Sequence, residues 1–263
     1  MHTGVSLTPN AYLNTIEKRN FTIKNITKII NDEDKNISDQ KLILHEVTDF
    51  YQKLYNSRDD ILDDVSIATV LDETSVPKLS HNEKMILESP ITTSEVLDSL
   101  KKLKNGKAPG TSGFQADFFK FFWSDMGHFI VRSFKCSILK GELSTSQKLG
   151  IITILPKGNK PRDFLKNWRP ISLLNTTYKI FSGIIASRLK KVLNTLIHEN
   201  QKGFLAGRFI GENTRLMYDI IHQTEILNKP GMILLLDFEK AFDSVSWKFI
   251  HKVLNFLILA RNL

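Results

Sequence analysis

The feature that most constrains the fold is the apolar run at residues 232–236, which leads directly into Asp237 and Phe238. Five consecutive apolar residues that follow a Pro-Gly turn signal are typical of a buried β-strand. A strand that ends on a carboxylate at the rim of a sheet is a common way to hold a hard divalent cation. An aspartate in this place can also simply cap the next helix. The run therefore predicts a strand and leaves two roles open for Asp237.

Most of the remaining chain follows a helical period rather than a strand period. Apolar residues recur at helical spacing in residues 39–56, 93–106, 111–143, 176–197 and 211–227. In the first of these helices we expect Asp39 as the N-cap, with Leu42, Leu44 and Tyr51 among the residues of one broad apolar face. Ser80 followed by Glu83 is a capping-box pattern and predicts another helix start. Residues 57–80 have no firm period and predict a loop or linker.

Two short segments favour strands. Residues 151–155 read "IITIL" and stop at Pro156, and the segment "NWRPISLLNT" contains a second apolar run. Together with residues 232–236 they form too little β-structure for a large sheet. The sequence therefore predicts an α+β fold that is largely helical, with a small, incomplete sheet. We expect Trp168 and Trp247 to belong to the core or scaffold.

The charge is divided unevenly along the chain. Residues 1–100 contain 10 Lys or Arg and 17 Asp or Glu, whereas residues 101–263 contain 26 and 11. The net charges are therefore −7 and +15. A strongly basic region indicates a polyanionic partner, although a solvated basic surface would give the same count.

Composition excludes several classes of protein. The single cysteine, Cys136, excludes an internal disulfide and a cysteine-rich zinc site, and its apolar neighbours favour a buried thiol. There is no run of eighteen apolar residues, and the N-terminus lacks the pattern of a signal peptide. We therefore expect no membrane partner and an intracellular location, with nucleus and cytoplasm both open.

An ordered series of short motifs narrows the possibilities further. The chain reads "ILPKGNK", "NWRPISLLN", "YKI", "ASRL", "NQKGFLAGR" and "DFEKAFDSVSW", in that order, after an upstream "KNGKAPGTSGFQADFFKFFW". This series resembles the reverse transcriptase region of non-LTR (LINE-type) retrotransposons over nearly the whole chain. The upstream segment resembles the lead-in of that family.

The resemblance implies a right-hand polymerase that copies RNA into DNA. Residues 1–100 would be an acidic, helical lead-in, and residues 101–263 would be the N-terminal part of the reverse transcriptase domain, with fingers and a partial palm. The implied partners are an RNA template, a DNA primer and deoxynucleoside triphosphates. The implied cofactor is Mg²⁺, because nucleotidyl transfer uses two metal ions.

The same resemblance assigns roles in the palm. Asp237 matches the first metal-binding aspartate, and the backbone carbonyl of Phe238 is a further candidate ligand. Phe242 matches the bulky residue that excludes a ribose 2′-OH, and Ala241 matches the small residue beside it. Without the family, Phe242 is equally compatible with a position in the core.

Four further residues match motifs upstream of the palm. Arg169 matches the fingers arginine that contacts the triphosphate, and Lys157 matches the fingers lysine. Cationic groups at these places would neutralise phosphate charge. Gln201 and Arg208 match a signature that we expect to shape the template path or to support it structurally. Outside the family context, Arg169 could be an ordinary surface arginine.

The sequence also departs from the family pattern. Ser112 and Glu212 stand where aspartates are usual. The chain ends at Leu263, so the Gly-Gln segment and the paired-aspartate hairpin of the palm are not expected. We therefore expect a truncated domain that is inactive alone. The alternatives are a non-catalytic nucleic-acid-binding remnant and an inert, aggregation-prone remnant with an unpaired strand at residues 232–236.

Overall fold

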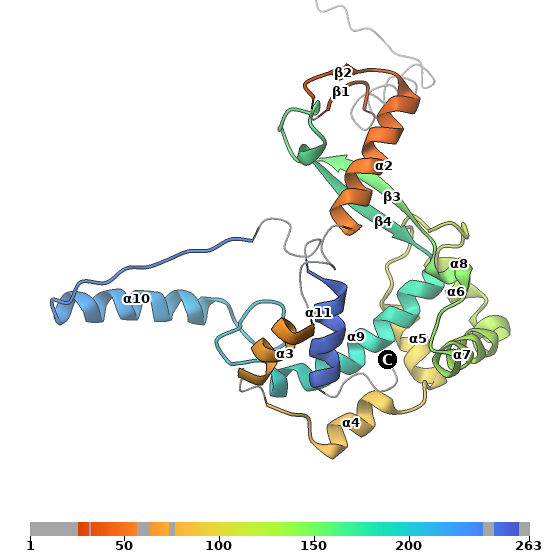
Figure 1. Ribbon diagram of the computed structural model, residues 1–263. Helices are drawn as coiled ribbons and strands as arrows, with labels where there is room; N and C mark the ends of the chain where they lie inside the picture. The colour runs from red at the N-terminus through yellow and green to blue at the C-terminus, as the bar shows by residue number, and fades with distance from the viewer. Residues whose placement is uncertain (1–25, 32, 57–63, 74–76, 239–244, 258–263) are drawn as a thin grey trace, which may run out of the picture. The chain divides into compact units, whose positions relative to one another are not determined.

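The computed structural model describes residues 26–31, 33–56, 64–73, 77–238 and 245–257 (Figure 1). The chain forms two compact units, which are described separately. The first consists of Met1–Ser57 and Ile151–Leu173, and the second of Arg58–Gly150 and Leu174–Leu263. The boundary near residue 100 that we expect from the charge and the motifs stays a prediction.

The first unit combines one long helix with two small sheets. Helix α2 spans Gln40–Asn56, and its first turn is capped by the Asp39 carboxylate, which accepts from the backbone N–H groups of Lys41 and Leu42 at 3.0 Å. Strands β1 (Ile29–Ile30) and β2 (Asn36–Ile37) pair antiparallel. The predicted cap is therefore confirmed.

The second sheet of this unit is a hairpin. Strands β3 (Gly150–Pro156) and β4 (Trp168–Leu174) are neighbours, and their arrows run in opposite directions (Figure 1). The short 3-10 helix η1 (Leu165–Asn167) leads into β4. Trp168 is buried, and its indole N–H donates to the carbonyl of Arg162 at 2.8 Å. This hydrogen bond fixes the loop between the strands, as expected for a scaffold residue.

The second unit is helical. Its helices are α3 (Asp64–Glu73), α4 (His81–Glu88), α5 (Thr93–Lys102), α6 (Ala116–Phe121), α7 (Trp123–Lys140), α8 (Thr145–Lys148), α9 (Thr176–Leu196), α10 (Gly211–Ile226) and α11 (Trp247–Phe256). The predicted capping box at Ser80 is present, because its hydroxyl and Glu83 exchange hydrogen bonds with each other's backbone N–H groups. Gly141, at φ 70°, ends α7 in the left-handed conformation.

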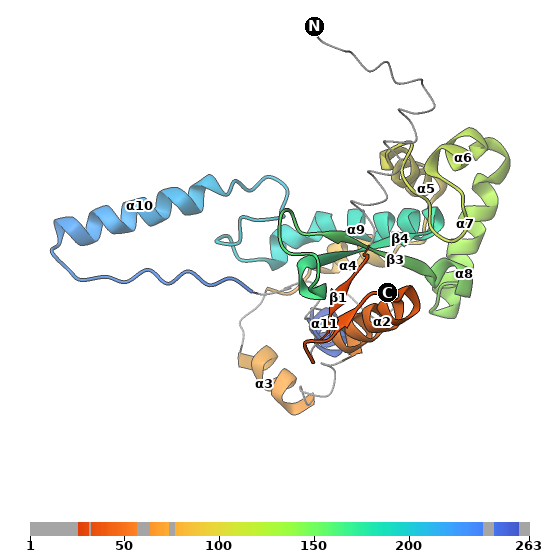
Figure 2. The ribbon, with the colours of Figure 1, turned by 90° about the horizontal axis from the view of Figure 1, so that it is seen from above.

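The core of this unit lies among α5, α6, α7 and α9, which gather together in both views (Figures 1 and 2). Phe134 of α7 and Ile180 of α9 are fully buried there, as is Leu100 of α5. Helices α5 and α9 approach closely at Gly183, where an added Cβ would lie 2.5 Å from the Ser99 hydroxyl oxygen. The predicted apolar faces of α5, α7 and α9 therefore meet in this core, whereas α10 has no buried residue.

The expected α+β, largely helical fold is confirmed, but two details of the helices differ. Helix α3 forms within residues 57–80, where we expected a loop, and it packs against α11. Helix α5 ends at Lys102, before the predicted Gly106, because Leu103 is extended at the C-cap, with φ −69° and ψ 132°. The Gly106 backbone N–H donates to the Asp117 carboxylate instead of to a helical carbonyl. In the described segments, every helix is too short or too polar to cross a lipid bilayer.

The predicted strand at residues 232–236 is wrong for this structure. The described sheets contain only β1 to β4, and residues 232–238 belong to neither sheet. Their side chains are exposed, with Leu235 at 84% and Met232 at 89%. A strand is defined by its hydrogen bonds to a neighbour, so apolar residues alone do not create one.

Four single-residue expectations about burial are also wrong. Leu42 and Leu44 are exposed, although Tyr51 of the same predicted face is buried, as is Ile43. Cys136 is exposed on the face of α7 opposite its buried residues, and Trp247 is 64% exposed. In these cases an apolar neighbourhood in sequence did not correspond to the buried face of the helix.

Candidate functional site

The carboxylate that motivates the metal hypothesis lies at the end of the exposed segment. Asp237 and Phe238 are both exposed, with Phe238 at 78%. Ala241 and Phe242 lie outside the described residues. Within the described part of the chain, no three His, Cys, Asp or Glu side chains gather as a metal site. The carboxylate and the Phe238 carbonyl offer two hard oxygen donors, which suit Mg²⁺ but fall short of its six ligands.

The two predicted phosphate-binding residues belong to the β3–β4 hairpin. Lys157 directly follows β3, and Arg169 is the second residue of β4 and is exposed. The Lys157 backbone N–H donates to the carbonyl of Asn167 at 2.8 Å, and its ammonium donates to the carbonyl of Lys166 at 2.7 Å. Lys157 is therefore paired with Asn167, which lies two residues before Arg169 in the chain.

This hairpin is strongly basic. Residues 157–169 contain five Lys or Arg and a single acidic residue, Asp163. The backbone carbonyl of Asp163 accepts from the N–H of Ile30 at 2.7 Å, and this hydrogen bond anchors the loop to β1. A fixed loop with a net charge of +4 concentrates positive potential at one end of the sheet.

Arg208 is held by the end of α9. Its guanidinium donates four hydrogen bonds, all to backbone carbonyls, of Asn194, Ile197, His198 and Gln201. These carbonyls include the last groups of α9, which have no partner within the helix. Gln201 is exposed, and its side-chain amide donates to the carbonyl of Gly203 at 3.4 Å. The geometry gives Arg208 a structural function and leaves any contact with a template as a prediction.

The departure at position 212 has a local explanation. Glu212 forms an ion pair with Lys202, which lies ten residues earlier in the same signature. The side-chain amide of Asn213 donates to the carbonyl of Asn200 at 3.0 Å. A glutamate is long enough to reach Lys202 from the first turn of α10. The ion pair therefore joins the loop before α10 to that helix without the usual aspartate.

The lead-in loop is organised by a residue that the sequence reasoning missed. Asn175, at the N-terminus of α9, is only 3% exposed. Its side-chain oxygen accepts from the Ser112 backbone N–H at 2.9 Å, and its amide donates to Thr111 and to the carbonyl of Ser146. An added Cβ on Gly110 would lie 2.5 Å from the Asn175 backbone nitrogen. Position 112 is therefore held through its backbone.

A buried ion pair is the second residue set that the sequence reasoning missed. Arg188 of α9 is 4% exposed and donates to both carboxylate oxygens of Glu95 at 2.8 Å. It also donates to the carbonyl of Leu87, in the last turn of α4, and to those of Ser89 and Pro90, which lie between α4 and α5. Hydrogen bonds from Arg188 lower the pKa of Glu95 to about 2, against the opposing effect of burial.

The sequence did contain a signal for this pair. Arg188 lies four residues after Ile184 and four before Val192, both of which are buried in α9. A charge in the middle of an apolar helical face requires a buried partner. Glu95 belongs to the capping box of α5 with Thr92, so one carboxylate serves both the cap and the ion pair.

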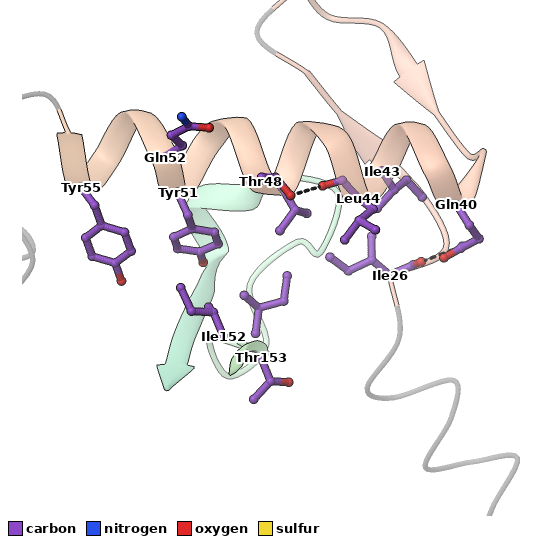
Figure 3. A pocket seen from close by; sticks show the side chains of 12 residues that line it. Ile26, Gln40, Ile43, Leu44, Thr48, Tyr51, Gln52, Tyr55, Ile152 and Thr153 are labelled. Atoms are coloured by element: carbon purple, nitrogen blue, oxygen red, sulfur yellow. Dashed lines mark hydrogen bonds between the residues drawn. The ribbon is translucent and has the colours of Figure 1, made fainter. Parts of the chain in front are cut away.

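A groove of about 620 Å³ lies between α2 and β3 in the first unit (Figure 3). Tyr51 and Tyr55 of α2 and Ile152 of β3 line it, and their side chains point toward the same space (Figure 3). All of the lining side chains are uncharged, and neither Lys157 nor Arg169 is among them. The groove therefore does not provide the charges that a triphosphate requires.

Comparisons with known proteins agree with the motif series. Residues 155–262 match the family model described as reverse transcriptase (RNA-dependent DNA polymerase). The chain is 35% identical over 235 residues, 89% of its length, to the transposon TX1 uncharacterized 149 kDa protein of Xenopus laevis. It is 28% identical over 169 residues, 62% of its length, to the probable RNA-directed DNA polymerase from transposon X-element of Drosophila melanogaster.

A third relative is the Pol polyprotein from the type-1 retrotransposable element R1 of Bradysia coprophila, which is 26% identical over 163 residues, 61% of the chain. The chain spans 18%, 19% and 16% of the lengths of the TX1, X-element and R1 proteins. The matched region contains the loop between β3 and β4, the whole of β4, the Arg208 loop and the segment that ends on Asp237. The chain therefore belongs to the reverse transcriptase family, in the branch carried by non-LTR retrotransposons.

Proposed function

We propose that this chain supplies the fingers and the first palm segment of an RNA-directed DNA polymerase. The substrates would be an RNA template, a DNA primer and deoxynucleoside triphosphates. The observation that supports this most strongly is the basic loop of the β3–β4 hairpin, which lies within the family match and carries Lys157 and Arg169 at its two ends. Two cations at one place suit the charge of a triphosphate.

The remaining roles follow the same proposal. Asp237 and the Phe238 carbonyl would bind a divalent metal, Mg²⁺ in our proposal, which would supply Lewis-acid stabilisation of the phosphates. Phe242 would exclude a ribose 2′-OH next to the small Ala241. Gln201 would face the template path, and Arg208 would hold that loop in shape. The DNA primer would then be extended in the palm.

We further propose that the chain does not catalyse the reaction by itself. Asp237 and the Phe238 carbonyl are too few to hold two metal ions, and the described residues gather no further cluster of ligands. The test is primer extension on an RNA template by the purified chain with Mg²⁺. We expect no product above that of an Asp237→Ala control. Extension that disappears in Asp237→Ala would contradict this proposal of inactivity.

A non-catalytic function in nucleic-acid binding is the second candidate, and the net charge of +15 in residues 101–263 favours it. Each phosphate contact with a single strand lowers the slope of log K against log salt by about 0.7. Replacing both Lys157 and Arg169 by Ala should therefore reduce the magnitude of the slope by about 1.4. Lys53→Ala, at an exposed lysine of α2, is the control and should leave the slope unchanged. Salt-independent binding would argue against this function.

A further inference from the structure

The segment between α9 and α10 is a loop closed on itself. Arg208 ties it to the end of α9 through four carbonyls, and the Lys202–Glu212 ion pair joins its first half to the start of α10. The Asn213 side chain closes the same gap by donating to the carbonyl of Asn200. A loop with this many internal bonds keeps one conformation when a ligand binds.

Two aromatic rings stand on the outside of this closed loop. Phe204 is 94% exposed, and Phe209 is 68% exposed. Phe204 also has a φ of 64°, in the left-handed region that disfavours a bulky side chain. Phe209 lies over Gly211, where an added Cβ would come within 2.3 Å of its ring. The fold therefore fixes both rings on the surface, although exposure and backbone strain both disfavour that arrangement.

Positive charge lies on the helix that leads into this loop. Lys190 and Lys191 are exposed on α9 within two turns of the start of the loop. Proteins that bind single-stranded nucleic acids combine exposed aromatic rings, on which bases stack, with cations that follow the phosphates. A duplex does not offer this contact, because both faces of its bases are already stacked.

We propose that the loop at residues 203–209 is a stacking site for an unpaired nucleobase, with Phe204 as the ring that stacks. Phe209 extends the apolar surface beside it, and Lys190 and Lys191 attract the backbone of the same strand. The inference rests on the proposed function in nucleic-acid binding and adds to it a specific site that recognises bases rather than phosphates.

The experiment measures the affinity of the full chain for three fluorescently labelled probes by anisotropy. The probes are an unstructured single-stranded RNA, an abasic strand of the same length, and an RNA duplex. The variants are Phe204→Ala, Phe204→Trp and the control Phe121→Ala. Phe121 of α6 is 80% exposed and lies outside the loop, so it matches Phe204 in exposure.

We expect Phe204→Ala to weaken binding to single-stranded RNA about tenfold, the scale of one base stack. Binding to the abasic strand and the duplex should be unchanged, and Phe204→Trp should restore the affinity. Phe121→Ala should behave as the unchanged chain on all three probes. Circular dichroism of each variant shows whether the fold is retained.

Three results would overturn the inference in distinguishable ways. Unchanged affinity of Phe204→Ala for single-stranded RNA would refute the stack while leaving nucleic-acid binding intact. An equal loss on all three probes would show that Phe204 supports the loop or a phosphate contact instead of a base. Failure of the unchanged chain to bind any probe would refute both the inference and the proposed binding function, and would leave the rings as a surface for a protein.

Discussion

Two apolar segments of the second unit have opposite environments. Residues of α9 such as Ile180 and Ile184 are completely buried, whereas Leu234 and Leu235, in a run of five apolar residues, are 69% and 84% exposed. Helix α9 satisfies its backbone internally and needs only an apolar neighbour, which α5 and α7 supply. A strand needs a neighbouring strand for every hydrogen bond along its edge. Apolar content therefore indicates that a segment would gain stability from burial. The segment is buried only where another element is available to pack or pair with it.

Replacing the buried cation of α9 should give the largest loss of stability. Arg188→Met removes the partner of Glu95 and of three backbone carbonyls, so we expect a loss of about 3–5 kcal/mol in the free energy of unfolding. The measurement is urea unfolding monitored by circular dichroism. Arg132→Met, at an exposed arginine of α7, should cost less than about 0.5 kcal/mol. Equal effects of the two substitutions would show that the Arg188 network is not formed.

Matched leucine truncations test the comparison itself. Leu100→Ala, at a completely buried site in α5, should cost about 2–5 kcal/mol because it leaves a cavity. Leu234→Ala removes the same atoms from an exposed side chain and should change the free energy of unfolding by less than about 0.5 kcal/mol. Denaturant midpoints of the two variants provide the measurement. A large loss for Leu234→Ala would mean that this segment is packed in solution.

Acid titration should distinguish the stability that comes from the Glu95–Arg188 ion pair from the stability that comes from the apolar core. The pKa of Glu95 in the folded chain is about 2, below its value in the unfolded chain, so its contribution is present above about pH 5 and is lost as the pH falls toward 2. We expect a loss on the order of 2 kcal/mol across this range. In Glu95→Gln the corresponding part of the slope should be absent. An unchanged slope would indicate that other carboxyl groups dominate acid unfolding.

The sequence predicted the elements whose stability is local. The Ser80 and Asp39 caps depend on residues within one turn, and both were predicted correctly. It missed the burial of Arg188 and Asn175, whose partners lie 93 and 63 residues away in the chain. It also gave residues 232–236 the wrong secondary structure, because the period of a strand specifies a face but not its neighbour.

The same distinction applies to the candidate site. The pairing of the two short strands beside Lys157 and Arg169 was not predicted, but the strands themselves could be predicted from local apolar runs. The carbonyl contacts of Arg208 could not, since a motif match gives no indication of where a guanidinium points. The roles of Asp237 and Phe242 depend on partners that are distant in sequence, so motif reasoning leaves them as predictions.

The close approach of α5 and α9 allows a double-mutant test of the core. Gly183→Ala places a methyl group 2.5 Å from the Ser99 hydroxyl oxygen, and we expect it to cost about 1–3 kcal/mol. Ser99→Ala removes that oxygen and leaves its Cβ at 3.7 Å, an ordinary contact. The added cost of Gly183→Ala should therefore fall by at least half in the Ser99→Ala background. Additive effects in urea unfolding would show that the helices can move apart freely.

The smallest expected effect is a gain in stability rather than a loss. Phe204→Gly relieves a left-handed backbone that costs a bulky residue about 1–2 kcal/mol, whereas glycine loses about 0.5–1 kcal/mol more conformational freedom on folding. We therefore expect a gain of about 0.5 kcal/mol in the free energy of unfolding, measured by thermal and urea unfolding together. Phe121→Gly, in the last turn of α6, should instead lose about 0.5–1 kcal/mol.

The exposed ring of Phe204 and the exposed residues 232–236 would then differ in the effect of substitution. A gain in stability at position 204, combined with weaker binding to single-stranded RNA, is the pattern expected when strain is retained for function. At residues 232–236 no strain is present to relieve, so substitutions there should change association between molecules rather than stability. If Phe204→Gly lowers the free energy of unfolding, the ring contributes packing energy, and the backbone strain at position 204 is not retained for ligand binding.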